Sequence, residues 1–313
     1  MKKTLFAILA LAAVVACNKA DVIDSNPGEA IQFGNAFVDN ATKAATDPSY
    51  NSTNLTAFNV YGAVEGVNIF DGDLVSKGSA AYGKAWTIAS DAPTQYWIAG
   101  ANYIFDAVVD ATSVVTDEAT GLPTILKYDA VGQKDMLHQR VTTVGKPTAN
   151  DGLVAFTFTH LLSKVKFTVT NNTAALATGY RYTITDIAIT GANLTGDYAV
   201  AGIWSNVTTG SYSIPAITVA SGKTEVCKAE VLLIPGTNKV GMTFKVVVEM
   251  NDPISGDWKS ITTTPKTYTN VIALAANTAY NFNVTLLLND EIKFTAQPVE
   301  QWDPTTPSTT PLQ

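Results

Sequence analysis

The sequence VGMTFKVVV, residues 240–248, alternates apolar side chains with other residues at the two-residue period of a β-strand. The sequence YNFNVTLLL, residues 280–288, shows the same alternation. Each run has one apolar face, which is typical of a strand buried on one side. The apolar faces consist of Val240, Met242, Phe244, Val246 and Val248 in the first run, and of Tyr280, Phe282, Val284, Leu286 and Leu288 in the second.

Further strand-like runs occur on the N-terminal side of these two. They cover residues 59–64, 103–109, 180–189 and 225–234, with Gly, Pro, Asn and Asp at their boundaries. After residue 17, no long stretch has the period and capping residues of a helix. These features predict an all-β protein built of β-sandwiches, because two inner sheet faces can bury the alternating apolar side chains.

A cluster of turn-forming residues suggests where the chain divides into domains. Residues 145–152 read GKPTANDG and separate two strand-like regions. We therefore predict two tandem β-sandwich domains, over residues 44–149 and 150–313. The alternative is that residues 145–152 form a hairpin loop within one domain. Residues 303–313 are rich in Pro, Thr and Ser, which predicts an extended tail at the end of the second domain.

The first residues have the pattern of an export signal. Lys2 and Lys3 precede an apolar run over residues 5–16, which is too short to cross about 30 Å of hydrocarbon as a permanent helix. The sequence VVAC at residues 14–17 resembles a lipobox, so we expect residues 1–16 to be a lipoprotein signal peptide and Cys17 to be acylated, for example with palmitate. The alternative is an ordinary signal peptide with an incidental Cys17. Both predict a protein outside the cytoplasm.

The charge composition argues against nucleic acid as a partner. Only 15% of residues are charged, the formal net charge is −7, and arginine occurs only at Arg140 and Arg181. No basic cluster is present to displace counterions from a phosphate backbone. If Cys17 carries lipid, Cys227 has no partner for an intramolecular disulfide, and its place in a strand-like run predicts a small buried side chain.

Motifs that would carry catalysis or hold a metal are missing from the sequence. The two histidines, His138 and His160, cannot form a three-histidine metal site, and no Cys/His cluster has zinc spacing. The sequence SGKT at residues 221–224 lacks the upstream glycine of a phosphate-binding loop. Asp71 and Asp73 have the spacing that opens a calcium loop, but the following ligand positions do not match. We therefore expect no enzyme activity, no cofactor and no metal.

One segment is distinctive enough to indicate a family. The sequence FTFTHLLSKVKFTV, residues 156–169, resembles the F-x-H-x-L-[SA]-K-V-x-F-x-V stretch of fimbrillins, the subunits of type V fimbriae. Shorter matches follow the same order along almost the whole chain after the signal. They are IQF at 31–33, FNVYG at 58–62, QYW at 95–97, YIF at 103–105, LIPG at 233–236, and IKF at 292–294 followed by Trp302. The resemblance implies two transthyretin-like β-sandwich domains.

The same segment predicts a change of buried face. Phe156, Phe158 and His160 share one strand parity, whereas Val165 and Phe167 share the other. A bulge or a crossing between sheets near residues 161–162 would produce this switch. Beside such a switch, we expect His160 to satisfy freed backbone polar groups rather than to act in catalysis.

The resemblance also implies a mode of assembly. Fimbrillin precursors are lipid-anchored in the outer membrane, a protease removes their N-terminal strand, and an extended segment of another subunit fills the vacated groove. Residues 17–43 would be the propeptide, with cleavage between Lys43 and Ala44, although the family usually has Arg at this position. The alternative is that Lys43 is an ordinary solvated lysine in a surface loop.

Two segments of this chain share an I-x-F-x-x-x-x-V pattern that suits such an exchange. The removable strand would contain Ile31, Phe33 and Val38. The candidate donor strand would contain Ile292, Phe294 and Val299. Main-chain hydrogen bonds would supply affinity and alternating side-chain pockets would supply register.

These observations predict a non-enzymatic structural subunit of a cell-surface fimbria with a role in cell adhesion. The expected partners are other copies of this chain or related fimbrial subunits, the processing protease, outer-membrane lipid through Cys17, and ligands on host or bacterial surfaces. The alternative function is a monomeric surface lipoprotein that binds glycans through exposed aromatic side chains. Its candidate residues are Trp86, Trp97, Trp204, Trp258 and Trp302.

Overall fold

The computed structural model describes residues 28–38, 54–77, 86–171, 180–220, 224–226, 230–286 and 292–299. The predictions on Cys17, Lys43, Ala44, Cys227 and Trp302 lie outside these residues. The regular secondary structure of the described chain consists of β-strands and two short 3-10 turns, η1 (Ala130–Gly132) and η2 (Asn150–Gly152), which confirms the all-β prediction.

The strands are β1 (Phe33–Val38), β2 (Ala57–Val64), β3 (Val67–Ser76), β4 (Thr87–Ile88), β5 (Asn102–Val109), β6 (Ser113–Thr116), β7 (Pro123–Asp129), β8 (Leu137–Val144), β9 (Val154–His160), β10 (Ser163–Asn171), β11 (Tyr180–Ala199), β12 (Ile203–Ile214), β13 (Ile217–Ala220), β14 (Thr224–Val226), β15 (Val231–Leu233), β16 (Gly236–Asn251), β17 (Trp258–Leu274), β18 (Thr278–Leu286) and β19 (Ile292–Val299).

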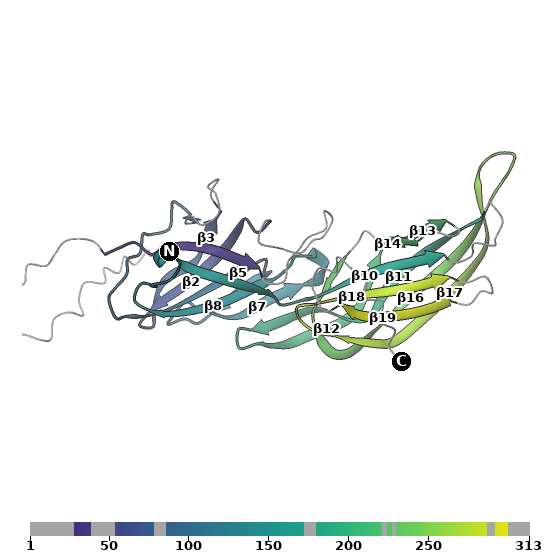
Figure 1. Ribbon diagram of the computed structural model, residues 1–313. Helices are drawn as coiled ribbons and strands as arrows, with labels where there is room; N and C mark the ends of the chain where they lie inside the picture. The colour runs from purple at the N-terminus through teal and green to yellow at the C-terminus, as the bar shows by residue number, and fades with distance from the viewer. Residues whose placement is uncertain are drawn as a thin grey trace, which may run out of the picture.

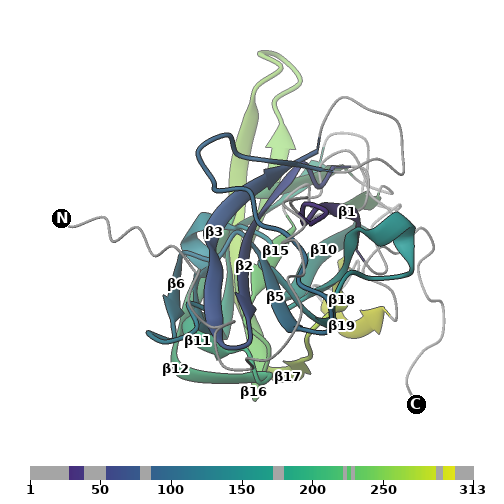
Figure 2. The same cartoon turned by 90° about the vertical axis from the view of Figure 1, so that its left-hand side faces the viewer.

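The N-terminal unit is a seven-stranded sheet that curls around its own core. Its strand order is β1-β9-β8-β5-β2-β3-β4. A single bridge between Phe33 of β1 and Trp86, the residue before β4, joins the two edges of this sheet. The Trp86 amide donates to the Phe33 carbonyl at 2.7 Å. Figure 2 looks at this unit from its own end and shows β2, β3 and β5 on one side of it, with β1 opposite.

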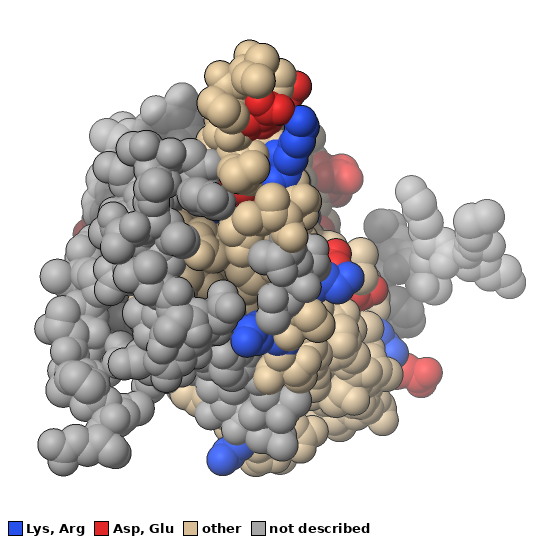
Figure 3. Space-filling view, turned by 90° about the vertical axis from the view of Figure 1, so that its right-hand side faces the viewer, with Lys and Arg blue, Asp and Glu red and all other residues tan. Residues whose placement is uncertain are grey.

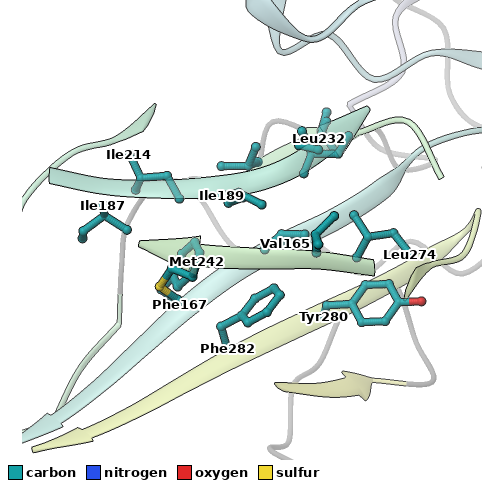
Figure 4. Close-up of a cluster of buried hydrophobic side chains, with 14 of the residues drawn as sticks. Val165, Phe167, Ile187, Ile189, Ile214, Leu232, Met242, Leu274, Tyr280 and Phe282 are labelled. Carbon is teal, nitrogen blue, oxygen red and sulfur yellow. The ribbon is translucent and has the colours of Figure 1, made fainter. Parts of the chain in front are cut away.

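The C-terminal unit is a sandwich of two sheets. One sheet has the order β14-β10-β18-β19, with β15 also paired to β10. The other has the order β17-β16-β11-β7-β6, and β12 and β13 also pair with β11. Figure 4 shows Phe167 and Phe282 of the first sheet facing Ile189 and Met242 of the second across an apolar core. The alternation read from residues 240–248 and 280–288 corresponds to β16 and β18.

The chain crosses from one unit to the other after β9. The buried face carries Phe156, Phe158 and His160 in β9 and Val165 and Phe167 in β10. The two strands belong to different sheets, so the predicted face switch is a sheet crossing.

The predicted domain boundary at residues 149 and 150 can be placed in the strand topology. It lies in the connection between β8 and β9, which pair antiparallel at Leu137 and His160. The Gly, Pro and Asn residues of this connection therefore make a hairpin, and the sheet changes between His160 and Ser163.

Two strands from the N-terminal half of the chain belong to the C-terminal sandwich. Strands β6 and β7 leave the N-terminal sheet, and β7 pairs with residues 195–199 of β11. The first part of the 20-residue strand β11 pairs with β16. Strand β11 thus extends along both neighbours, as Figure 1 shows in side view.

Candidate assembly site at strand β1

Strand β1 lies at one end of the N-terminal sheet and runs parallel to β9. Its partners there are Val154 for Phe33 and Phe158 for Val38. The two strands are more than one hundred residues apart in sequence, so no tight turn connects them. A terminal strand held by pairing and packing alone is a strand that can be exchanged without breaking a hairpin.

The side chains of this segment form the centre of the N-terminal core. Ile31, Phe33 and Val38, the three residues predicted for the removable strand, are 2%, 0% and 5% exposed. The Phe33 ring stacks on Phe156 at 5.9 Å between centroids. It also meets Phe70 and Phe105 edge-on, at 5.4 and 5.7 Å. Without β1, these apolar neighbours would line a long groove.

A bulge explains how Phe33 and Val38 are both buried. They are five positions apart, and in a regular strand an odd spacing places two side chains on opposite faces. The register with β9 shifts by one residue between Gly34 and Phe37, which returns Val38 to the core face. Gly34 has a steric role here, because a Cβ atom would lie 2.6 Å from Leu153 Cδ1.

Backbone groups hold the start of this segment from both sides. The Val154 amide donates to the Gln32 carbonyl at 2.9 Å on the β9 side. On the other side, the Ile31 amide donates to the Gln95 carbonyl at 2.8 Å, and the Trp97 amide donates to the Glu29 carbonyl at 2.9 Å. Loss of the segment would leave these groups without partners, and another extended chain could restore the hydrogen bonds.

An ion pair marks the outer end of the segment. The Lys146 ammonium, in the β8–β9 hairpin, contacts the Glu29 carboxylate. Gly152 has φ = +79°, and a Cβ atom there would collide with Cε of Lys146, so the lysine stem lies against the bare glycine. Sequence reasoning missed this pair, because a lysine in a polar turn has no local pattern that identifies its partner.

The candidate donor segment forms strand β19 in the C-terminal unit. It lies at the edge of its sheet and pairs antiparallel with β18. Ile292 is opposite Leu286, Phe294 is opposite Val284, and the ladder has no register shift. In this structure the two segments with the I-x-F-x-x-x-x-V pattern therefore belong to different sheets.

His160 lies against a buried carboxylate. Its Nδ1 lies 2.9 and 3.1 Å from the two carboxylate oxygens of Asp135, and both side chains are fully buried. The sequence did not predict this carboxylate, which the connection before β8 places at the sheet crossing. Burial, and next the charge of Asp135, raise the pKa of the nearby Tyr128 hydroxyl. Neither side chain of this pair is accessible to solvent.

The other histidine contributes to a second pair of this kind. His138 Nε2 lies 2.7 Å from the Asp106 carboxylate. Arg140 donates to the same carboxylate from Nε at 2.9 Å and from Nη2 at 2.8 Å. Asp106 is fully buried, and β5 places it directly opposite Arg140 of β8. The arrangement links the middle strands of the N-terminal sheet, and the sequence did not predict it.

The remaining candidates do not come together as a ligand site. Trp86 and Trp97 are buried in the N-terminal core. Trp258 lies under the Arg181 guanidinium, 4.5 Å from the ring centroid to the guanidinium carbon. Trp204 packs against Tyr128 and Tyr198. The four tryptophans that the structure describes therefore do not form an exposed stacking platform.

Charged residues also remain dispersed. Asp71 and Asp73 lie within β3, not in a calcium loop. No three His, Cys, Asp or Glu side chains of the described chain gather as a metal site. Figure 3 shows scattered charges on the described surface of the C-terminal end. Within the described ranges, no helix has the length and apolarity required to cross a bilayer.

Comparison with known proteins gives a consistent result. The family model of fimbrillin-like proteins matches residues 42–302. A fimbrial protein from Bacteroides vulgatus has a similar structure, with a TM-score of 0.56 and 13% identity over 88% of this chain and 99% of that one. A protein from Bacteroides ovatus described as a cell adhesion protein has a TM-score of 0.53 and 15% identity over 88% and 98%. At these identities the two structures show a shared fold. No curated protein matches the sequence.

Proposed function

This chain belongs to the fimbrillin-like family, and from that premise we propose that it is a structural subunit of a cell-surface fimbria that polymerises by strand exchange. Its precursor would be lipid-anchored in the outer membrane until proteolysis removes β1. A donor strand from another subunit would then occupy the groove beside β9. We propose no enzyme activity for this chain.

The observation that carries this function is the fully buried Phe33 in a strand at the edge of its sheet. An edge strand normally exposes one row of backbone groups and packs modestly, yet β1 supplies the ring at the centre of its core. A subunit that loses this strand would expose apolar side chains and unpaired backbone groups, and both favour binding of a replacement strand. A donor strand captured in the groove that β1 leaves would connect two subunits.

The second requirement is a donor with matching chemistry. Ile292, Phe294 and Val299 repeat the spacing of Ile31, Phe33 and Val38, and β19 already has extended backbone at a sheet edge. To place both its aromatic residue and its valine in the groove, the donor must shift register by one residue, as β1 does. The donor would exchange its pairing with β18 for pairing with β9 of the next subunit.

Activation is expected between Lys43 and Ala44. Cleavage there separates Cys17 and β1 from the rest of the chain, so it releases the anchor and opens the groove in one step. N-terminal sequencing of subunits from purified fibres should give Ala44 as the first residue. Fibres whose subunits retain residues 31–43 covalently would contradict activation by strand removal.

Anchoring of the precursor is expected to depend on Cys17. Cys17→Ala should release the precursor from the membrane fraction, because stable anchoring needs the acyl chains that this residue would carry. Mass spectrometry of the N-terminal peptide and membrane fractionation measure the two effects, with Cys227→Ala as the matched control. Unchanged fractionation of the Cys17 variant, together with a wild-type peptide that lacks lipid, would refute the lipoprotein assignment.

A further inference from the structure

We infer that Lys146 sets the register of the incoming donor strand by pairing with Asp290 of the neighbouring subunit. In the precursor the same lysine pairs with Glu29, two positions before Ile31. This inference rests on the proposed strand exchange. It specifies which residue of the acceptor subunit recognises the register of the donor strand. The Lys146 ammonium would exchange the carboxylate of Glu29 for the carboxylate of Asp290.

The acceptor side of this contact is already assembled. Lys146 lies in the hairpin that leads into β9, the strand along which β1 is paired. Gly152 leaves room for the lysine stem, which points the ammonium toward the start of the β1 segment. Removal of residues up to Lys43 takes Glu29 away and leaves this positioned cation without its carboxylate.

The donor side has an acid at the same offset. The removable segment reads Glu29-Ala30-Ile31-Gln32-Phe33, and the candidate donor reads Asp290-Glu291-Ile292-Lys293-Phe294. Asp290 stands two positions before Ile292, as Glu29 does before Ile31. A donor that follows the path of β1 parallel to β9 would therefore bring a carboxylate to Lys146.

This ion pair would distinguish registers of the donor strand that the apolar residues cannot distinguish. A slip of one residue would turn Ile292 and Phe294 out of the groove, so the alternation itself excludes it. A slip of two residues keeps the same strand face inward. It would place either Leu288 or Ile292 opposite Lys146, and only the unslipped strand offers the lysine a carboxylate.

A zero-length carbodiimide cross-linker tests the contact in the wild-type protein, because it joins an amine to a carboxylate only when the two touch. In the uncleaved precursor, peptide mass spectrometry should identify a Lys146–Glu29 link. In purified fibres it should identify a Lys146–Asp290 link between two chains, recovered from the dimer band of a denaturing gel. The Lys259–Asp252 pair, 2.7 Å apart, is the internal control and should be linked in both samples.

The alternative outcomes separate this inference from the proposed function. If fibres show the control link while Lys146 is joined to another carboxylate of a neighbouring chain, or to none, the register role is wrong and strand exchange stands. If Lys146 remains linked to Glu29 in fibres, β1 has not left, and both proposals are overturned.

Charge reversal tests the functional consequence. Lys146→Glu should reduce the yield of polymer per folded precursor about fivefold, the range of an exposed ion pair turned repulsive, and Asp290→Lys should do the same. The double variant should recover polymer yield, whereas Lys239→Glu, at an exposed lysine of β16, should leave it unchanged. Equal loss in the single and double variants would refute pairing between the two residues.

Discussion

Replacing Phe33 with alanine should lower the free energy of unfolding of the uncleaved precursor by about 3–5 kcal/mol. The ring is fully buried and packs against Phe70, Phe105 and Phe156, so truncation leaves a cavity at the centre of the N-terminal core. Urea unfolding, followed by a probe in the N-terminal unit, measures the change. Phe37→Ala is the matched control on the same strand, because Phe37 is only half-buried, and it should cost distinctly less.

The same substitution has a different expected effect after assembly. If processing removes β1, fibres formed by the Phe33→Ala variant should resist denaturant as well as wild-type fibres do, since the altered residue is no longer present. Measurement of the denaturant concentration that dissociates each fibre makes this comparison. A variant fibre weakened as much as the precursor would show that β1 stays in the assembled subunit.

Replacing His160 with alanine should destabilise the protein by about 3–5 kcal/mol, because it leaves the buried carboxylate of Asp135 without its imidazole partner. The loss of a neutral hydrogen bond to backbone would cost only about 1–3 kcal/mol. Chemical unfolding of the variant decides between the two ranges. Thr159→Ala, at the exposed neighbouring position of β9, is the control and should lie within about 0.5 kcal/mol of wild type.

A double-mutant cycle attributes that cost to the pair. Asp135→Ala should be destabilising in the wild-type background and much less so in the His160→Ala background, since the interaction between the carboxylate and the imidazole is already absent there. Additive effects of the two substitutions would mean that His160 stabilises the sheet crossing through its packing and not through Asp135.

Several strands were predictable because each of them carries its own period. Alternate side chains of residues 240–246 in β16 and of residues 280–286 in β18 are buried, and the parity change after His160 corresponds to the crossing from β9 to β10. Pairing between distant strands has no comparable local pattern. The excursion of β6 and β7 into the C-terminal sandwich therefore could not be predicted.

The candidate site was predictable to a similar extent. The apolar residues of β1 followed from their spacing and from the family resemblance, and the structure buries all three of them. The polar partners did not follow. Glu29 and Lys146 are 117 positions apart, and Asp135 lies 25 positions before His160. Contacts of this kind depend on tertiary placement of single side chains, which leaves no periodic trace in the sequence.

Strand β11 bears on how a fibre of such subunits would respond to pulling. Its 20 residues extend for roughly 60 Å at about 3.3 Å per residue, pairing first with β16 and then with β7. A load along the subunit would therefore act in shear on many backbone hydrogen bonds at once. Strand β7 lies between β5 and β8 of the N-terminal sheet in sequence, so its pairing with β11 ties that sheet to the C-terminal sandwich, and each subunit should behave as a stiff rod.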